Sequence, residues 1–405
     1  MKKFKHLIIL AAGQSSRFWP LSHKNFFQFL SKPAILHQLE SLSNKAESVY
    51  IVANDQNKNE LEKISKSNFI NVAIVVQEGE GMADAVLTVA EKVGDEEALI
   101  INSIDFFDEN LLDQVSEKAA LTGADLVIVS KKIDGYFPGG YIRFENDRVI
   151  EIIEKPDPEK KPSNHIKLVV DYFKHLSDFV TVLKQTDITR EDRYEAALTN
   201  YINNNKVATN VFYDGEWVTL KYPWHVLDAT NYFLRKVKPH RGKNAQIADS
   251  AIIEGNVYIG DNVKVFEYAK ISGPAFIGNG TIIGNYSLIR NSIIGENCLI
   301  GGYCEITRSN LGDRVFLHRN YVGDSVLSGG VVMGAEAVLA NWRFDQKNIS
   351  SPVKGNMVDT QRNKLGAILG KNVKIGVNTS VMPGVKIAAG SLVLPQTIVK
   401  RDIGD

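Results

Sequence analysis

From position 247 to 289, every sixth residue is aliphatic: Ile247, Ile253, Ile259, Val265, Ile271, Ile277, Ile283 and Ile289. The same spacing returns near the end of the chain, at Leu369, Ile375, Val381, Ile387, Val393 and Val399. Neither an α-helix nor a β-strand repeats at six, since their side chains recur at 3.6 and 2 residues. A repeat of six is typical of a parallel β-helix, in which each flat face is one short strand. The pattern therefore predicts a left-handed parallel β-helix of hexapeptide repeats over residues 245–405.

Glycine follows the repeated aliphatic residue at many positions, as in Ile259-Gly260 and Ile277-Gly278. Glycine tolerates the tight corner that a flat-faced coil needs after each inward side chain. The repeat is broken once, between about Asn341 and Gly366, where polar and basic residues replace the aliphatic ones. Such an insertion predicts a loop that leaves one face of the coil, and loops on repeat scaffolds often carry the function.

The first half of the chain has a different pattern, in which short apolar runs alternate with helical periodicity. The runs at 6–10, 48–52, 71–76, 98–101 and 125–129 predict strands, and helices are expected at 34–43, 57–65, 82–93 and 109–120. This alternation favours a Rossmann-like α/β domain with a mostly parallel sheet covered on both faces. The basic, aperiodic segment 235–244 is interpreted as a linker. We therefore expect domains at 1–232 and 245–405, joined by residues 233–244.

Charge and cysteine content narrow the function classes. Lys+Arg and Asp+Glu are both 47, so net charge offers no argument for nucleic acid or an anionic membrane as a partner. The two cysteines, Cys298 and Cys304, are too few for a disulfide framework and suit a reducing compartment. No stretch approaches the roughly 18 apolar residues of a membrane span. We expect a cytoplasmic protein that binds neither nucleic acid nor a membrane.

The first predicted strand ends in a turn that is suited to anions. It runs into Ala11-Ala12-Gly13 and turns through Gln14-Ser15-Ser16-Arg17. Small residues let the backbone approach a ligand, successive N–H groups form an anion-binding concavity, and Arg17 adds positive charge for phosphate. A strand-to-helix turn that binds nothing could show the same residues, and Arg17 could instead pair with a surface acid.

The segment LAAGQSSRFWPLSHKNFFQFLSKP resembles the fingerprint of the sugar-1-phosphate nucleotidylyltransferases, L-A-A-G-x-G-T-R-L…P-K…K-P. The resemblance places Lys24 at the family's catalytic lysine and Ala11, Ala12 and Gly13 in the nucleotide-binding loop. It implies in-line attack by a sugar-1-phosphate oxygen on the α-phosphorus of UTP or dTTP, with release of pyrophosphate. Arg17 would then hold the leaving phosphates, and Lys24 would lie over the α-phosphate. A lone lysine is otherwise most often solvated.

Further matches follow in the order of the family. Gln77 and Gly81 resemble the nucleobase-reading stretch, and Asp105 stands where the family keeps a Mg²⁺-binding aspartate. Gly140, Glu154 and Lys155 resemble the sugar-binding elements. Asp105 could also simply cap the next helix.

Five departures from the family pattern leave the nucleotidyl transfer open. The segment Leu168-Val169-Val170-Asp171-Tyr172 replaces the family's N-x-G strand on the sugar side. Ser15 replaces the second glycine of the loop, and His23 replaces the proline before the lysine. Thr219 stands at the second metal-ligating aspartate, and His225 at the aspartate after Pro-Trp. A hydroxyl is a weaker Mg²⁺ ligand than a carboxylate. A retained but inactive domain is the alternative.

The C-terminal half carries a second set of polar residues. The segments that begin at His318, Ala340 and Arg362 are similar to H-x-x-Y-V-G-D-S, A-N-L-R-x-D and R-K-L-G-A of the archaeal-type bifunctional amino-sugar-1-phosphate acetyltransferase/nucleotidylyltransferases. Acetyl transfer needs a base that titrates near neutrality, and His318 is the candidate. The resemblance implies that Tyr321 and Asn341 bind the substrate, that Lys347 holds the sugar phosphate, with Arg362 and Lys364 as helpers, and that acetyl-CoA binds between the subunits of a homotrimer.

Each of these residues also has a simpler interpretation. His318 could bond a neighbouring turn, and the three cations could be solvated loop charges. Ser350 replaces a second basic residue of the family. The leading prediction is a bifunctional enzyme. The alternatives are an acetyltransferase with a weak or inactive nucleotidyltransferase domain, and a non-catalytic regulatory or structural subunit.

Overall fold

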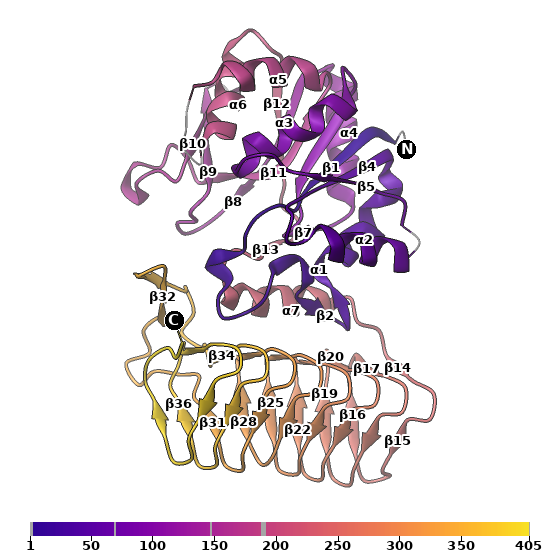
Figure 1. Ribbon diagram of the computed structural model, residues 1–405, viewed down its shortest axis with the longest axis vertical. Helices are drawn as coiled ribbons and strands as arrows, with labels where there is room; N and C mark the ends of the chain where they lie inside the picture. The colour runs from indigo at the N-terminus through magenta and orange to yellow at the C-terminus, as the bar shows by residue number, and fades with distance from the viewer. Residues whose placement is uncertain (1–2, 69, 146–147, 188–191, 405) are drawn as a thin grey trace. The chain divides into compact units, whose positions relative to one another are not determined.

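The computed structural model describes residues 3–68, 70–145, 148–187 and 192–404 (Figure 1). The chain divides into two compact units: unit 1 is Met1–Gln14 with Ile35–Trp217, and unit 2 is Ser15–Ala34 with Val218–Asp405. This division differs from the boundary expected from the sequence. The loop with Arg17 and Lys24 and the segment from Val218 onward belong to unit 2, together with the β-helix.

Among the described residues of unit 1, nine strands form one mixed sheet, along the path β10-β9-β11-β6-β1-β4-β5; β8 also pairs with β11, and β12 pairs with β8. Strands β1, β4, β5 and β6 pair in parallel, whereas β11 runs antiparallel to β6, β8 and β9. The strands are β1 Phe4–Leu10, β4 Ala46–Ala53, β5 Ala73–Val76, β6 Ala98–Asn102, β8 Leu126–Lys132, β9 Gly140–Glu145, β10 Arg148–Glu154, β11 His165–Phe173 and β12 Ala208–Phe212.

Helices lie between these strands, as the alternating pattern predicts. They are α1 Ala34–Leu42, α2 Lys58–Ser67, α3 Gly81–Val93, α4 Asn110–Thr122, α5 Leu176–Gln185 and α6 Arg193–Asn203. Leu7, Ile8 and Ile9 of β1 are all buried. A continuous apolar run of this kind is typical of a parallel strand covered on both faces. Among the described residues, no helix has the length and hydropathy of a membrane span.

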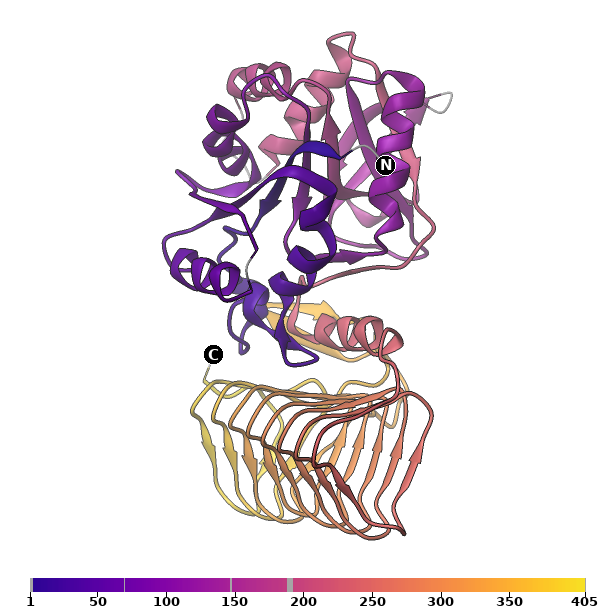
Figure 2. The same ribbon diagram turned by 90° about the vertical axis from the view of Figure 1, so that its right-hand side faces the viewer.

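Most of unit 2 is a three-sided left-handed parallel β-helix, whose coils stack one on another in Figure 2. The first face consists of β14 His240–Arg241, β17 Val257–Ile259, β20 Ala275–Ile277, β23 Ile293–Ile294, β26 Asn310–Leu311, β29 Val326–Leu327, β34 Ile368–Leu369 and β37 Lys386–Ile387. The second face consists of β15 Gln246–Ile247, β18 Lys264–Val265, β21 Ile282–Ile283, β24 Leu299–Ile300, β27 Phe316–Leu317, β30 Val332–Met333, β35 Lys374–Ile375 and β38 Leu392–Val393. The third face consists of β16 Ile252–Glu254, β19 Lys270–Ser272, β22 Leu288–Arg290, β25 Glu305–Thr307, β28 Tyr321–Gly323, β31 Val338–Leu339, β36 Ser380–Val381 and β39 Ile398–Val399.

The repeated aliphatic residues form the core of the β-helix, as the period of six predicts. Ile271, Ile289, Ile306 and Val322 lie in register on consecutive coils and are fully buried. Their spacing falls from 18 to 17 and then to 16 residues. A corner can therefore lose one residue while the inward side chains stay aligned, and this explains why the strict period of six ends at Ile289.

The expected linker is partly regular structure. Helix α7 (Val226–Arg235) extends into it, and β14 already pairs with Tyr258 and Ile259 of the next coil. The broken repeat after Asn341 is an insertion between β31 and β34, and it carries the antiparallel hairpin of β32 (Ser350–Val353) and β33 (Asn356–Asp359).

Candidate functional sites

In unit 1, the turn after β1 is fixed by two asparagines that lie outside the sequence motif. The carbonyl of Ala11 accepts a hydrogen bond from Asn57 Nδ2 at 2.8 Å, and that of Ala12 accepts one from Asn54 Nδ2 at 2.7 Å. A Cβ added to Gly13 would meet no atom within 4 Å. The structure thus holds the predicted nucleotide-binding backbone in place and leaves open space beside Gly13.

The predicted nucleobase-reading residues lie together at the start of α3, which begins at Gly81. Gln77 Nε2 donates to the carbonyl oxygens of Gly79 at 3.2 Å and Gly81 at 3.0 Å. Both glycines have φ above +80°, a backbone conformation that other residues rarely adopt. The Gln77 side chain therefore stabilises the turn that leads into α3.

Asp105 begins strand β7 (Asp105–Phe107) and is only 4% exposed. Gln38 Nε2 donates to its backbone oxygen at 2.5 Å. Among the described residues, no group of three or more His, Cys, Asp or Glu side chains is arranged to hold a metal ion. One carboxylate nevertheless suits Mg²⁺, which is commonly bound by one or two carboxylates together with substrate phosphates and waters.

The predicted sugar-binding residues are also brought together. A Cβ on Gly140 would lie 3.3 Å from Glu154 Oε2 and 3.7 Å from Glu195 Cγ. Lys155 Nζ lies 3.4 Å from Glu154 Oε1. Glu195 comes from α6 and was not identified from the sequence. Burial, reinforced by the charge of Glu154, raises the pKa of Glu195 to about 7.

A buried ion pair lies in the same region of unit 1. Lys167 Nζ is 2.6 Å from Asp171 Oδ2, and both side chains are almost fully buried. The Tyr194 hydroxyl donates to the same oxygen at 2.9 Å. Removing one partner of a buried ion pair leaves an uncompensated charge in the protein interior, so Lys167 and Asp171 constrain β11. The sequence marked the segment with Asp171 only as a departure from the family's sugar-side strand, and nothing in it indicated that Asp171 pairs with Lys167.

In unit 2, the loop with Arg17 and Lys24 is shaped by Ser15. Ser15 has φ 57°, in the left-handed region that favours glycine, so the structure explains why the family places glycine there. The Ser15 hydroxyl accepts a hydrogen bond from the backbone N–H of Lys24 at 3.3 Å. Arg17 lies in the short helix Ser16–Phe18, and Lys24 begins the next one, Lys24–Phe26.

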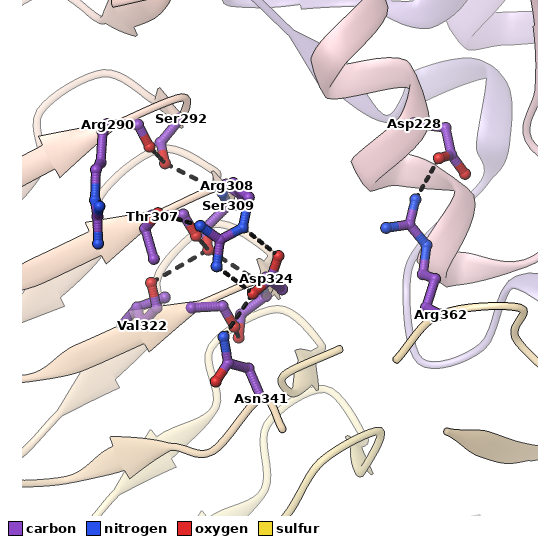
Figure 3. A network of polar contacts seen from close by, with 12 residues as sticks. Asp228, Arg290, Ser292, Thr307, Arg308, Ser309, Val322, Asp324, Asn341 and Arg362 are labelled. Atoms are coloured by element: carbon purple, nitrogen blue, oxygen red, sulfur yellow. Dashed lines mark hydrogen bonds and ion pairs between the residues drawn. The ribbon is translucent and has the colours of Figure 1, made fainter. Parts of the chain in front are cut away.

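His225 is half-buried beside charged neighbours. Burial lowers its pKa to about 4; Asp228 opposes the shift, and Arg362 and Lys24 add positive charge that reinforces it. Its Nδ1 lies 3.0 Å from the backbone oxygen of Thr219. Figure 3 shows Arg362, from the insertion, directed at Asp228 of α7, with which it forms an ion pair. Arg362 is therefore already engaged by a carboxylate.

Tyr321 and Asn341 lie together on neighbouring coils of the third face. Asn341 Nδ2 donates to Asp324 Oδ2 at 2.5 Å, and the Asn341 side chain also hydrogen-bonds the Tyr321 hydroxyl. Arg308 holds Asp324 with two bonds, of 2.7 Å from Nε and 2.8 Å from Nη2 (Figure 3). Gly323 leaves the room for this cluster, since a Cβ there would lie 2.6 Å from both Asn341 Nδ2 and the Tyr321 oxygen. Burial raises the pKa of Tyr321, so its hydroxyl keeps its proton.

His318 lies on the coil of Tyr321, three residues earlier, and its side chain is exposed. Its backbone N–H donates to Asn320 Oδ1 at 2.6 Å. Asn320 is buried and donates to the carbonyls of Gly334 and Ala337 at 2.9 Å, so the turn that carries His318 is anchored to the next coil. Lys347 and Lys364 are exposed on the insertion.

The chain combines a Rossmann-like unit, which has a small-residue loop after its first strand, with a hexapeptide β-helix, and the family model that matches the first part assigns it to the nucleotidyl transferases. The Nucleotidyl transferase family model matches residues 6–220, and the GMPPB C-terminal domain model matches residues 239–359. The structure of a UDP-glucose pyrophosphorylase complexed with UDP-glucose, 21% identical, superposes with a TM-score of 0.51 over 57% of this chain and 99% of that one, which shows the shared fold.

Two relatives extend the similarity to the whole chain. A bifunctional sugar-1-phosphate nucleotidylyltransferase/acetyltransferase of Sulfurisphaera tokodaii is 31% identical over 98% of this chain and 97% of the relative. A bifunctional protein GlmU of Methanococcus maripaludis is 36% identical over 98% of this chain and 95% of the relative. The chain belongs to this family of bifunctional nucleotidylyltransferase/acetyltransferases.

Proposed function

We propose that the chain acetylates an amino-sugar-1-phosphate with acetyl-CoA and transfers a nucleotidyl group from UTP or dTTP to a sugar-1-phosphate, with release of pyrophosphate. The observation that carries the proposal is the cluster of Tyr321, Asn341, Asp324 and Arg308 on one face of the β-helix. The Sulfurisphaera tokodaii relative carries both activities in its name, and both relatives align with nearly the whole chain.

In the acetyl transfer, the amine of the sugar attacks the thioester carbonyl and the thiolate of coenzyme A leaves. His318 takes the proton that the amine loses. Asn341 donates to Asp324 and hydrogen-bonds Tyr321, so the Tyr321 O–H remains available as a donor to the sugar or to the developing oxyanion. Lys347 and Lys364 hold the sugar phosphate. Arg362 binds the same phosphate when the phosphate displaces Asp228 from its ion pair with Arg362.

The test is release of free thiol from acetyl-CoA in the presence of glucosamine-1-phosphate. His318→Ala should lower the rate at least about a hundredfold, within the usual range for a lost general base. His240→Ala, an exposed histidine on the first coil, is the matched control and should keep the wild-type rate. Equal rates for the wild type and His318→Ala would contradict the assignment.

In the nucleotidyl transfer, the sugar-1-phosphate oxygen attacks the α-phosphorus and pyrophosphate leaves in line. Arg17 holds the leaving phosphates and Lys24 neutralises charge on the α-phosphate. The backbone of Ala11, Ala12 and Gly13 contacts the nucleotide, Gln77 and Gly81 face the base, and Gly140, Glu154 and Lys155 bind the sugar. Asp105 would hold Mg²⁺, which supplies neutralisation of the phosphate charge when it is bound.

Pyrophosphate release with UTP or dTTP and a panel of sugar phosphates tests this half. Lys24→Ala should abolish sustained release, whereas Lys66→Ala, an exposed lysine on α2, should not change it. One observation favours an acetyltransferase with a silent first domain: Thr219, at the position of the second metal aspartate, offers only a hydroxyl and is 9% exposed. Absence of pyrophosphate release with every pair, while acetylation persists, would establish that alternative.

We also infer a homotrimer in the cytoplasm, with acetyl-CoA bound between neighbouring β-helices. The free thiols of Cys298 and Cys304 agree with a reducing compartment. Light scattering coupled to size-exclusion chromatography measures the oligomeric state, and a monomer that is active in acetylation would contradict the inference.

A further inference from the structure

A pocket of about 180 Å³ lies within unit 2, apart from the Tyr321–Asn341 cluster. One wall is the segment around Phe26 and Phe27, and the other is the corner that follows the first face of the β-helix, including Asp313, Arg314 and Lys371. The volume lies below the range of about 300–1,000 Å³ that is typical of drug-sized ligands. The pocket therefore suits a small molecule rather than a nucleoside triphosphate.

Arg314 breaks a regular pattern at this corner. One residue of every coil has positive φ there, and in the other coils it is asparagine or glycine: Asn244, Asn262, Gly280, Asn297, Gly330, Asn372 and Gly390. Arg314 adopts φ 54° at the same position. A left-handed conformation costs most L-residues about 1–2 kcal/mol, and asparagine and glycine tolerate it best. A residue that is locally unfavourable points to a role beyond folding.

Two cations bracket the pocket across three coils. Lys371 stacks in register with Gly329 and Asp313, so Arg314 and Lys371 are two coils apart, about 10 Å at the usual strand spacing. The middle coil has Gly329 and Gly330 at this corner, so this coil adds no side chain of its own between the two cations, and the Asn372 side chain lies over Gly330. Within the described part of the chain, neither cation has an ion-pair partner.

The remaining lining fits an oxyanion. Asp313 is the carboxylate of the pocket, and its Oδ1 accepts from the backbone N–H of Glu296 at 2.9 Å, so one oxygen is tied to the preceding coil. Ser22 and Ser328 supply hydroxyl donors, and Phe26 and Phe27 supply an apolar wall. Two cations against one carboxylate leave the site net positive. Phosphate offers the dianionic charge and several acceptor oxygens that such a site can satisfy.

We propose that this pocket is a binding site for a phosphate group, either inorganic or carried by a small sugar, distinct from both proposed catalytic sites. Its ligand contacts the segment that flanks Lys24 as well as the β-helix. The site rests on its own residues, and binding there does not require either transferase activity.

Isothermal titration of the full chain with orthophosphate, and separately with glucose 6-phosphate, tests the proposal at low salt. Arg314→Asn restores the residue that other coils use, so the fold is retained, and Lys371→Gln removes the second charge. Each should raise the dissociation constant of this site at least tenfold. Lys243→Gln is the matched control, because Lys243-Asn244 occupies the same corner on the first coil as Lys371-Asn372.

Binding of phosphate at the proposed catalytic sites should be the same in the wild type and in the three variants, so the difference between their dissociation constants isolates this pocket. Tighter binding of orthophosphate identifies the inorganic ion as the ligand, and tighter binding of glucose 6-phosphate identifies a sugar phosphate. Wild-type affinity for both probes in Arg314→Asn and in Lys371→Gln would overturn the proposal, whether or not the protein turns over substrate.

Discussion

Glu195 makes the stability of unit 1 depend on pH in a direction that can be tested. Its carboxyl is buried beside Glu154, and burial raises its pKa from an ordinary value of 4.5 to about 7. Between these two values the unfolded chain has lost a proton that the folded chain keeps. By linkage, the contribution of Glu195 to the free energy of unfolding is then largest below pH 4.5 and is lost as pH rises through 7.

The size of the effect follows from the shift. A difference of about 2.5 pKa units corresponds to about 3 kcal/mol, at roughly 1.4 kcal/mol per unit. Glu195→Gln keeps the shape and removes the ionisation. The variant should match the wild type near pH 4.5 and should exceed its free energy of unfolding by up to about 3 kcal/mol at pH 8.

Urea unfolding followed by circular dichroism at 222 nm is the assay, because helices α2–α6 all belong to unit 1 and the β-helix contributes little signal there. Glu117→Gln, an exposed glutamate on α4, is the control and should leave the pH profile unchanged. A Glu195→Gln profile that runs parallel to the wild type from pH 4.5 to 8 would refute the reasoning.

Three further changes test other parts of the structure. Asp324→Asn removes the charge that Arg308 and Asn341 bind, so acetylation should lose about 10- to 100-fold in kcat/KM, as expected for a lost charge-assisted hydrogen bond. Free-thiol release measures it, and an unchanged kcat/KM would show that the cluster is only structural. Ser15→Gly removes a non-glycine residue from the left-handed region, so the free energy of unfolding should rise by about 1 kcal/mol. The change also removes the hydroxyl that accepts the Lys24 N–H, so pyrophosphate release should slow. Faster release would instead show that the serine restrains the loop unproductively. Cys298 should resist iodoacetamide in the folded protein, since burial raises the pKa of its thiol to about 12, and Cys298→Ser should fold normally because Thr281 occupies the equivalent position one coil earlier. Rapid labelling of native Cys298, followed by mass spectrometry, would contradict its burial.

Much of the architecture was predictable from the sequence. The inward side chain of a β-helix recurs by local geometry, so Ile271 and Ile289 revealed the coil without any knowledge of distant contacts. The predicted strands and helices of unit 1 also agree with the structure, because their patterns are set by neighbours in the chain. The motif around Gly13 and Lys24 pointed to the family that the comparisons show.

Other features depend on contacts between residues that are far apart in the sequence. Asp228 and Arg362 are 134 positions apart, and nothing in either local pattern indicates that they pair. Glu195 looks like an ordinary polar residue of a helix until α6 is placed beside Gly140 and Glu154. Periodicity records which side of its own element a residue occupies. Only the tertiary structure decides which distant group lies beside that residue, and this neighbour determines the residue's charge, burial and chemistry.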